Sequence, residues 1–131
     1  MIPILLVDDD PDMLDLMQLA FKDTGNFDVT ACSDARDAVE VLKQRPIAVV
    51  ISDYRMPIMS GGVFVREARA TGYDGLFIIY SGRGKDALID QARHDGADAY
   101  IPRSGDFKKE LASIKSIIYN QAQDTSGLLR G

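Results

Sequence analysis

Short, unbroken runs of apolar residues divide this sequence and restrict its fold more than any other feature. They lie at residues 4–7, 27–31, 47–51, 76–80 and 99–102. Continuous apolar runs without polar alternation are typical of strands whose two faces are both buried. The stretches between the runs place apolar residues at the spacing of amphipathic helices. This alternation predicts an α/β domain in which helices cover both faces of a parallel sheet.

Polar residues and proline mark where the predicted helices begin. Asp10 followed by Pro11 supplies an N-cap and a proline at the first helical position, and Ser60 precedes another helical stretch. Residues 106–110 are predicted to form the capped, solvated first turn of the last helix. The clearest apolar stripe lies on that helix: Phe107, Leu111, Ile114 and Ile118. These signals agree with a repeated strand–helix unit.

The length and charge of the chain fit a single domain. With 131 residues it can bury enough surface to fold without a disulfide, and its one cysteine, Cys32, indicates a reducing compartment. The net charge of −5 disfavours direct nucleic-acid binding, and the first residues match neither a signal peptide nor a membrane span. We expect a cytoplasmic domain over residues 1–121 and a tail or linker over residues 122–131, where the apolar periodicity ends.

Polar side chains follow most of the predicted strands directly. The first strand ends in Asp8 and Asp9, the third in Asp53, the fourth in Ser81 and the fifth in Arg103. In open α/β sheets the functional site lies outside the carboxyl ends of the strands, so we expect these side chains to meet at one crevice.

The expected cluster of carboxylates favours a cation and phosphoryl chemistry. Like charges in a partly desolvated crevice must either raise their pKa values or recruit a cation, and carboxylate oxygens suit Mg²⁺. With a metal present, Ser81 offers a hydroxyl donor and Arg103 a fixed positive charge to phosphoryl oxygens. A purely structural interpretation stands beside this one. Asp10 is a helix cap, Asp12 is an acid favoured in a first turn, and acidic residues at one strand end have little specificity alone.

Four segments together resemble the response-regulator receiver domain of two-component signalling. They are residues 5–10 (LLVDDD), 50–57 (VISDYRMP) with Gly61, 80–82 (YSG), and 96–101 (GADAYI) before Arg103. The resemblance extends to about residue 120. It implies a single doubly wound (βα)5 flavodoxin-like domain, with a five-stranded parallel sheet in the order 2-1-3-4-5.

The resemblance assigns a phosphoryl acceptor and a metal site. Asp53 falls at the position of the phosphoryl-accepting aspartate. Asp9 falls on the acid that binds Mg²⁺ directly, and Asp8 on the acid that binds it mainly through water. Asp53 and the backbone carbonyl of Arg55 complete the implied ligand set.

The resemblance also implies a switch and a set of partners. Ser81 occupies the position of the hydroxyl that follows the phosphoryl group, and Tyr100 the position of the aromatic switch residue. A histidine kinase or phosphotransfer protein would donate the phosphoryl group. An effector protein or output domain would bind the face formed by helix 4, strand 5 and helix 5, and the domain would be a monomer or a phosphorylation-linked dimer. Such a protein transfers a phosphoryl group to itself and loses it by autodephosphorylation, so we do not class it as an enzyme.

One departure from the family pattern lies after the fifth strand, where Arg103-Ser104 replaces the usual Lys-Pro. Because a non-proline cis peptide costs about 2.5–4 kcal/mol, we expect a trans Arg103–Ser104 bond and a repositioned loop. The same departure motivates an alternative function, a receiver-like interaction module whose output does not depend on phosphorylation.

Further alternatives concern the chemistry of the crevice. A flavin-binding protein of similar architecture needs a phosphate loop after the first strand, where residues 8–10 would repel the phosphate. A phosphatase with an aspartyl intermediate needs a second acid two residues after its nucleophile, where this chain has Arg55. Arg55 and Arg83 either flank an acyl phosphate and alter its lifetime or are ordinary solvated arginines.

Overall fold

The computed structural model describes the backbone of residues 1–23, 25–82 and 86–130, and the side chains of these residues except 86 and 122–130. Strands and helices alternate along the chain, as the apolar runs predict. Their bounds are β1 (Ile2–Val7), α1 (Pro11–Lys22), β2 (Phe27–Cys32), α2 (Ala35–Gln44), β3 (Val49–Ser52), α3 (Gly61–Ala70), β4 (Leu76–Ser81), α4 (Asp86–Asp95), β5 (Ala99–Pro102) and α5 (Phe107–Arg130).

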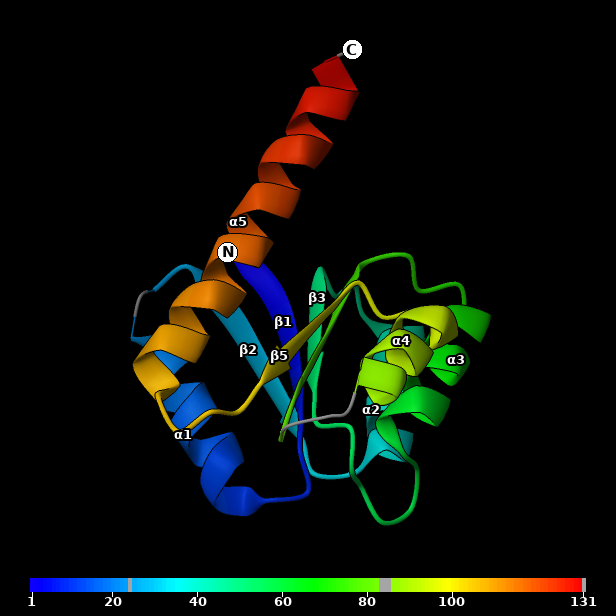
Figure 1. The fold of residues 1–131 in the computed structure, drawn as a ribbon. Coiled ribbons are helices and arrows are strands. Elements are labelled where there is room, and N and C mark those ends of the chain that lie inside the picture. The colour runs from blue at the N-terminus through cyan, green and yellow to red at the C-terminus, as the bar shows by residue number, and fades with distance from the viewer. Residues whose placement is uncertain (24, 83–85, 131) are drawn as a thin grey trace.

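The strands form one parallel sheet in the order β2-β1-β3-β4-β5. Helices α1 and α5 cover one face of this sheet, and α2, α3 and α4 cover the other (Figure 1). The chain therefore reverses its direction of winding after β2, which places the switch point of the strand order beside β1 and β3. The predicted fold class and strand order are confirmed.

Residues along the central strands β1, β3 and β4 alternate between two hydrophobic clusters, which explains why their apolar runs are continuous. The edge strand β2 differs, because Asp28 is exposed, so the prediction that the run 27–31 is buried on both faces was wrong. In β4, Ile78 and Tyr80 pack in the cluster with α1 and α5, whereas Phe77 and Ile79 pack in the cluster with α2, α3 and α4. Both faces of the strand are buried, so neither needs polar side chains.

The predicted helix starts are also confirmed. The side chain of Asp10 accepts a hydrogen bond from the amide of Asp12, and Pro11 opens α1. The hydroxyl of Ser60 accepts from the amide of Val63 at 3.3 Å at the start of α3. These caps satisfy amides that have no partner within the helix, and so fix where each helix begins.

Helix α5 continues to Arg130 and extends beyond the sheet (Figure 1), although the apolar periodicity ends near residue 121. Backbone hydrogen bonds can continue a helix beyond the end of an apolar stripe. The division into a domain over residues 1–121 and a tail over residues 122–131 stays a prediction. Within the part of the chain that the structure describes, no helix has the length and apolar character needed to cross a membrane.

Candidate functional site

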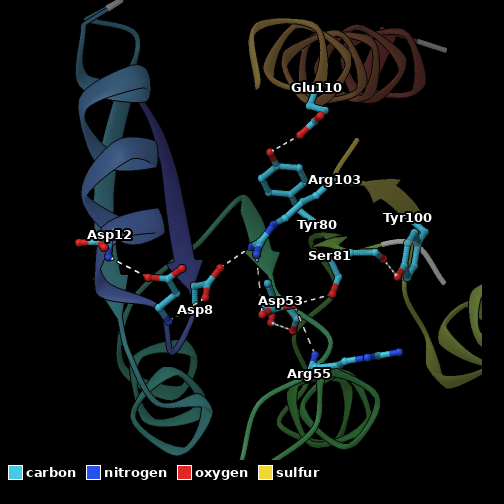
Figure 2. Close-up of polar contacts among 12 residues, drawn as sticks. Asp8, Asp12, Asp53, Arg55, Tyr80, Ser81, Tyr100, Arg103 and Glu110 are labelled. Carbon is cyan, nitrogen blue, oxygen red and sulfur yellow. Dashed lines mark hydrogen bonds and ion pairs between the residues drawn. The ribbon is translucent and has the colours of Figure 1, made fainter. Parts of the chain in front are cut away.

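The site lies at the carboxyl edge of the sheet, where the ends of β1, β3, β4 and β5 meet (Figure 2). The parallel register pairs Val7 with Ser52, so the residues that follow them, Asp8 and Asp53, leave the sheet side by side. The amide of Asp53 donates to the carbonyl of Val7 at 3.0 Å, and that of Arg103 donates to the carbonyl of Ser81 at 2.7 Å. Backbone pairing thus brings the candidate site residues from distant segments to one place.

Three carboxylates form the acidic part of the site. One oxygen each of Asp8, Asp9 and Asp53 lies within 4.8 Å of the other two. The side chain of Asp8 is 1% exposed, that of Asp53 is 12% exposed, and Asp9 is exposed to solvent. A set of oxygen ligands with a solvent-facing member fits Mg²⁺, which keeps several waters when it binds to proteins. The grouping that the sequence predicts is therefore present.

Burial dominates the electrostatics of Asp8. Its loss of solvent raises the pKa of the Asp8 carboxyl above the ordinary value, although the amide of Asp10 and the guanidinium of Arg103 act in the opposite direction. The amide of Asp10 donates to Asp8 Oδ1 at 2.9 Å, and Arg103 Nη2 forms an ion pair with Asp8 Oδ2. A buried acid with a raised pKa gains from a second cation, because positive charge favours its ionised form.

Asp53 lies among hydrogen-bond donors. Ser81 Oγ donates to Asp53 Oδ1 at 2.5 Å, and the amide of Arg55 approaches the same oxygen at 3.4 Å. Arg103 Nη1 lies 3.9 Å from Asp53 Oδ2. The guanidinium of Arg103 therefore spans two carboxylates, with its shorter contact to Asp8. This arrangement leaves Asp53 both reachable by solvent and surrounded by groups that stabilise negative charge.

Tyr100 lies at the edge of the site rather than against Asp53. Its ring is half-buried, and its hydroxyl donates to the carbonyl of Gly82 at 2.8 Å, next to Ser81 (Figure 2). Arg55 has an exposed side chain. Arg83 lies outside the described residues. The Arg103–Ser104 peptide bond is trans, as the missing proline predicts.

Sequence reasoning missed two residues that support the site, Tyr80 and Glu110. The guanidinium carbon of Arg103 lies 4.7 Å from the centre of the Tyr80 ring, and the hydroxyl of Tyr80 donates to Glu110 Oε1 at 2.5 Å. Glu110 is 6% exposed, so the prediction of a solvated turn over residues 106–110 was wrong for this residue. Its position four residues before Ile114 places it on the apolar face of α5, and this spacing was the available signal.

Together, the parallel sheet order and the acid cluster at its carboxyl edge define a flavodoxin-like protein with a polar site at the switch point. The family model of the response regulator receiver domain matches residues 4–115. The chain belongs to this family, and so to the proteins of two-component signalling.

Named relatives agree with this assignment. The chain is 29% identical over 122 residues to the response regulator Rre1 of Synechocystis sp., covering 92% of this chain and 53% of that protein. It is 28% identical to a probable chemotaxis protein CheY of Rhizobium etli, covering 88% and 92%. The chain thus spans about half the length of one relative and most of the other.

Solved structures share the fold. A response regulator receiver domain protein from Clostridium thermocellum is 26% identical, with a TM-score of 0.80, and the match covers 98% of this chain and 99% of that chain. The receiver domain of the Francisella response regulator 1452 is 20% identical, with a TM-score of 0.81 and coverage of 93% and 99%.

Proposed function

We propose that this receiver domain is a phosphorylation-dependent switch that accepts a phosphoryl group on Asp53 from a histidine kinase or phosphotransfer protein, with Mg²⁺ as cofactor. The observation that carries the proposal is the surroundings of Asp53. Its carboxylate is 12% exposed and lies between the hydroxyl of Ser81, the guanidinium of Arg103 and the carboxylates of Asp8 and Asp9. An accessible nucleophile among charge-stabilising groups is the arrangement that phosphoryl transfer requires.

The proposed transfer forms one bond and breaks another. A carboxylate oxygen of Asp53 attacks phosphorus in line, and the phosphorus–nitrogen bond of the donor phosphohistidine breaks. The imidazole nitrogen keeps the electron pair, and a ring protonated on its other nitrogen leaves as neutral imidazole. Ser81 moves its hydrogen bond from Asp53 to a phosphoryl oxygen, and Arg103 offers further donors to the same group.

Mg²⁺ would be held by Asp8, Asp9, Asp53 and the backbone carbonyl of Arg55. It would supply positive charge to the phosphoryl oxygens. Tyr100 is the proposed switch residue that responds when Ser81 changes its partner. Hydrolysis of the acyl phosphate by water then returns the domain to its first state, so the chemistry is confined to the protein's own side chain.

Membership of the receiver family implies a histidine kinase as donor partner and an effector as output partner. We further propose that the output face is formed by α4, β5 and α5 and that the protein acts in the cytoplasm. A monomer that dimerises on phosphorylation is compatible with this face. A phosphoryl group shifts the population toward the conformation with which it makes the better contacts.

The test is the intact mass of the protein after incubation with acetyl phosphate and Mg²⁺. The parent is expected to gain one phosphoryl group, and Asp53→Asn is expected to gain none. Asp28→Asn, which changes an exposed acid on β2, is the matched control and should behave as the parent. A parent without the mass gain, or a gain retained in Asp53→Asn, would overturn the proposal.

A second candidate function is an interaction module that works without phosphorylation. The ion pair between Arg103 and Asp8 favours it, because a cation of the protein already neutralises part of the acidic cluster. Addition of beryllofluoride and Mg²⁺ distinguishes the two functions. Amide resonances of α4, β5 and α5 should shift for the switch and stay in place for the module.

A further inference from the structure

Glu110 is a buried acid that belongs to α5 and not to the acidic cluster. Its Oε1 accepts from the hydroxyl of Tyr80 at 2.5 Å. Its Oε2 accepts from the amide and the hydroxyl of Ser104, both at 2.9 Å, and from the amide of Asp106 at 3.1 Å. One carboxylate therefore joins the end of β4 to the loop between β5 and α5.

The same carboxylate reaches Arg103 by two routes. Through its hydrogen bond with Tyr80, Glu110 holds the ring that contacts Arg103. The guanidinium carbon of Arg103 lies 4.7 Å from the centre of this ring. Through Ser104, Glu110 fixes the residue that follows Arg103 in the chain. Figure 2 shows the hydrogen bond from Tyr80 to Glu110, with Arg103 drawn beside the ring of Tyr80.

The position of Arg103 depends on such contacts because its own hydrogen bonds do not involve the Nε atom. The Nε atom of Arg103 is buried and has no hydrogen-bond partner among the described residues. The two terminal nitrogens face Asp8 and Asp53. The ring of Tyr80 adds a further contact to the guanidinium, a cation–π interaction with the guanidinium carbon 4.7 Å from the ring centre.

The replacement of the family's Lys-Pro pair by Arg103-Ser104 explains why the contacts of Tyr80 and Glu110 matter in this chain. A guanidinium is planar and presents its donors in a fixed fork, so its use depends on its orientation more than that of an ammonium does. A loop without proline has more backbone freedom to lose on folding, and the hydrogen bonds of Ser104 and Asp106 to Glu110 restrict that freedom. Arg103 and Ser104, which stand in place of Lys-Pro, are thus both connected to Glu110, Arg103 through the ring of Tyr80 and Ser104 by a direct hydrogen bond.

We propose that Tyr80 and Glu110 are positioning residues that hold the guanidinium of Arg103 where it meets both Asp8 and Asp53. The proposal rests on the proposed function for its effect on phosphoryl transfer, but the placement of Arg103 exists without it. Neither residue touches the reacting atoms. Their effect passes through Arg103 alone, and this restriction makes them testable.

The experiment compares substitutions in two backgrounds. Tyr80→Leu, Tyr80→Phe and Glu110→Gln are each made in the parent and in Arg103→Met, and phosphorylation by acetyl phosphate with Mg²⁺ is followed by intact mass. In the parent, Tyr80→Leu should slow the reaction about tenfold, because a misplaced group loses its effect on the transition state. Tyr80→Phe keeps the ring and should lose less. In Arg103→Met, each substitution should change the rate by less than about twofold.

Equal slowing in both backgrounds would overturn the proposal, since it would show a general structural effect. Thermal unfolding of every variant identifies those that fail to fold, and Tyr80→Phe retains the core volume if Tyr80→Leu does not fold. The Nε–Hε NMR signal of Arg103 provides a readout that needs no phosphorylation. It should shift in Tyr80→Leu because the ring current is removed, and an unmoved signal would also overturn the proposal. A parent that is not phosphorylated would refute the proposed function while this signal still tests the placement.

Discussion

Arg103 forms its closest ion pair with Asp8, the buried acid at the end of β1, and lies farther from Asp53, at 3.9 Å. The cation that the sequence places near the proposed phosphoryl acceptor is thus engaged mainly with a predicted metal ligand. An arginine in this position lowers the electrostatic cost of the acidic cluster in the absence of metal, and it opposes a second cation at the same place.

Arg103→Met should therefore bind Mg²⁺ more tightly than the parent. Removing one positive charge beside Asp8 and freeing its Oδ2 should strengthen binding about tenfold. Isothermal titration with MgCl₂ measures the change. Arg36→Met, which removes an exposed arginine paired with Asp34, serves as control and should leave the affinity unchanged. Equal or weaker binding by Arg103→Met would contradict competition between the two cations.

Ser81→Ala should slow phosphorylation of Asp53 by acetyl phosphate by about tenfold, the value of one hydrogen bond to a charged group. The hydroxyl donates to Asp53 Oδ1 at 2.5 Å and is in reach of a group attached there. Ser81→Thr keeps the donor and should retain most of the rate. Rates are read from the intact mass over time, with Ser113→Ala on the exposed side of α5 as control. A Ser81→Ala rate equal to that of the parent would remove this hydroxyl from the mechanism.

Glu110 makes the stability of the fold depend on pH in a defined direction. Burial acts to raise the pKa of this carboxyl, but hydrogen bonds from Tyr80, Ser104 and Asp106 outweigh it and hold the pKa below the ordinary value of 4.5. A group whose pKa is lowered by folding stabilises the folded state above its unfolded pKa. That stabilisation is lost as the pH falls through the lower, folded pKa.

The difference in free energy of unfolding between the parent and Glu110→Gln should consequently be constant near neutral pH and shrink below about pH 4.5. Urea unfolding at several pH values gives this difference. The other charged groups around Glu110, Asp106 and Arg103, are present in both proteins, and the burial that raises the pKa of Tyr80 keeps its hydroxyl neutral in this range. A difference that grows toward acid pH would reverse the assigned sign.

Much of the fold and of the acidic site was open to prediction because it follows from sequence-local features. Apolar runs identify buried strands, and the carboxyl ends of parallel strands meet at one edge. The sequence alone therefore predicts that Asp8, Asp9, Asp53 and Ser81 lie together. The prediction of the strand order depended on the resemblance to a known family, because the alternation of strands and helices alone allows more than one order.

The contacts of Tyr80 and Glu110 were not predictable in the same way. Tyr80 is part of an apolar strand, and its hydroxyl partner is 30 positions away in the sequence. Glu110 follows two lysines at a helix start, where an acid is ordinarily solvated. Both contacts depend on how α5 packs against β4, and that packing is a tertiary property. The same holds for the choice of Asp8 as the nearer partner of Arg103.

Arg69 of α3 offers a last prediction, about stability. Its guanidinium donates to the carbonyls of Tyr73, Gly75 and Gly96 and pairs with Asp98 at 3.1 Å. Arg69→Ala should lower the free energy of unfolding by about 2–3 kcal/mol, because partly buried carbonyls of three residues lose their donors. Arg69→Lys should recover little, since an ammonium lacks the planar fork that reaches separate acceptors.

Arg66, on the same helix, provides the matched control. Its side chain is 60% exposed and lies 3.6 Å from Asp95, so Arg66→Ala should cost less than about 1 kcal/mol. Urea unfolding of the three variants compares them directly. Equal destabilisation by Arg66→Ala and Arg69→Ala would contradict this explanation. The contribution of Arg69 to stability would then have to come from its charge and not from its hydrogen bonds to backbone carbonyls. The expected contrast therefore separates hydrogen bonding to the loops from simple ion pairing on the surface of α3.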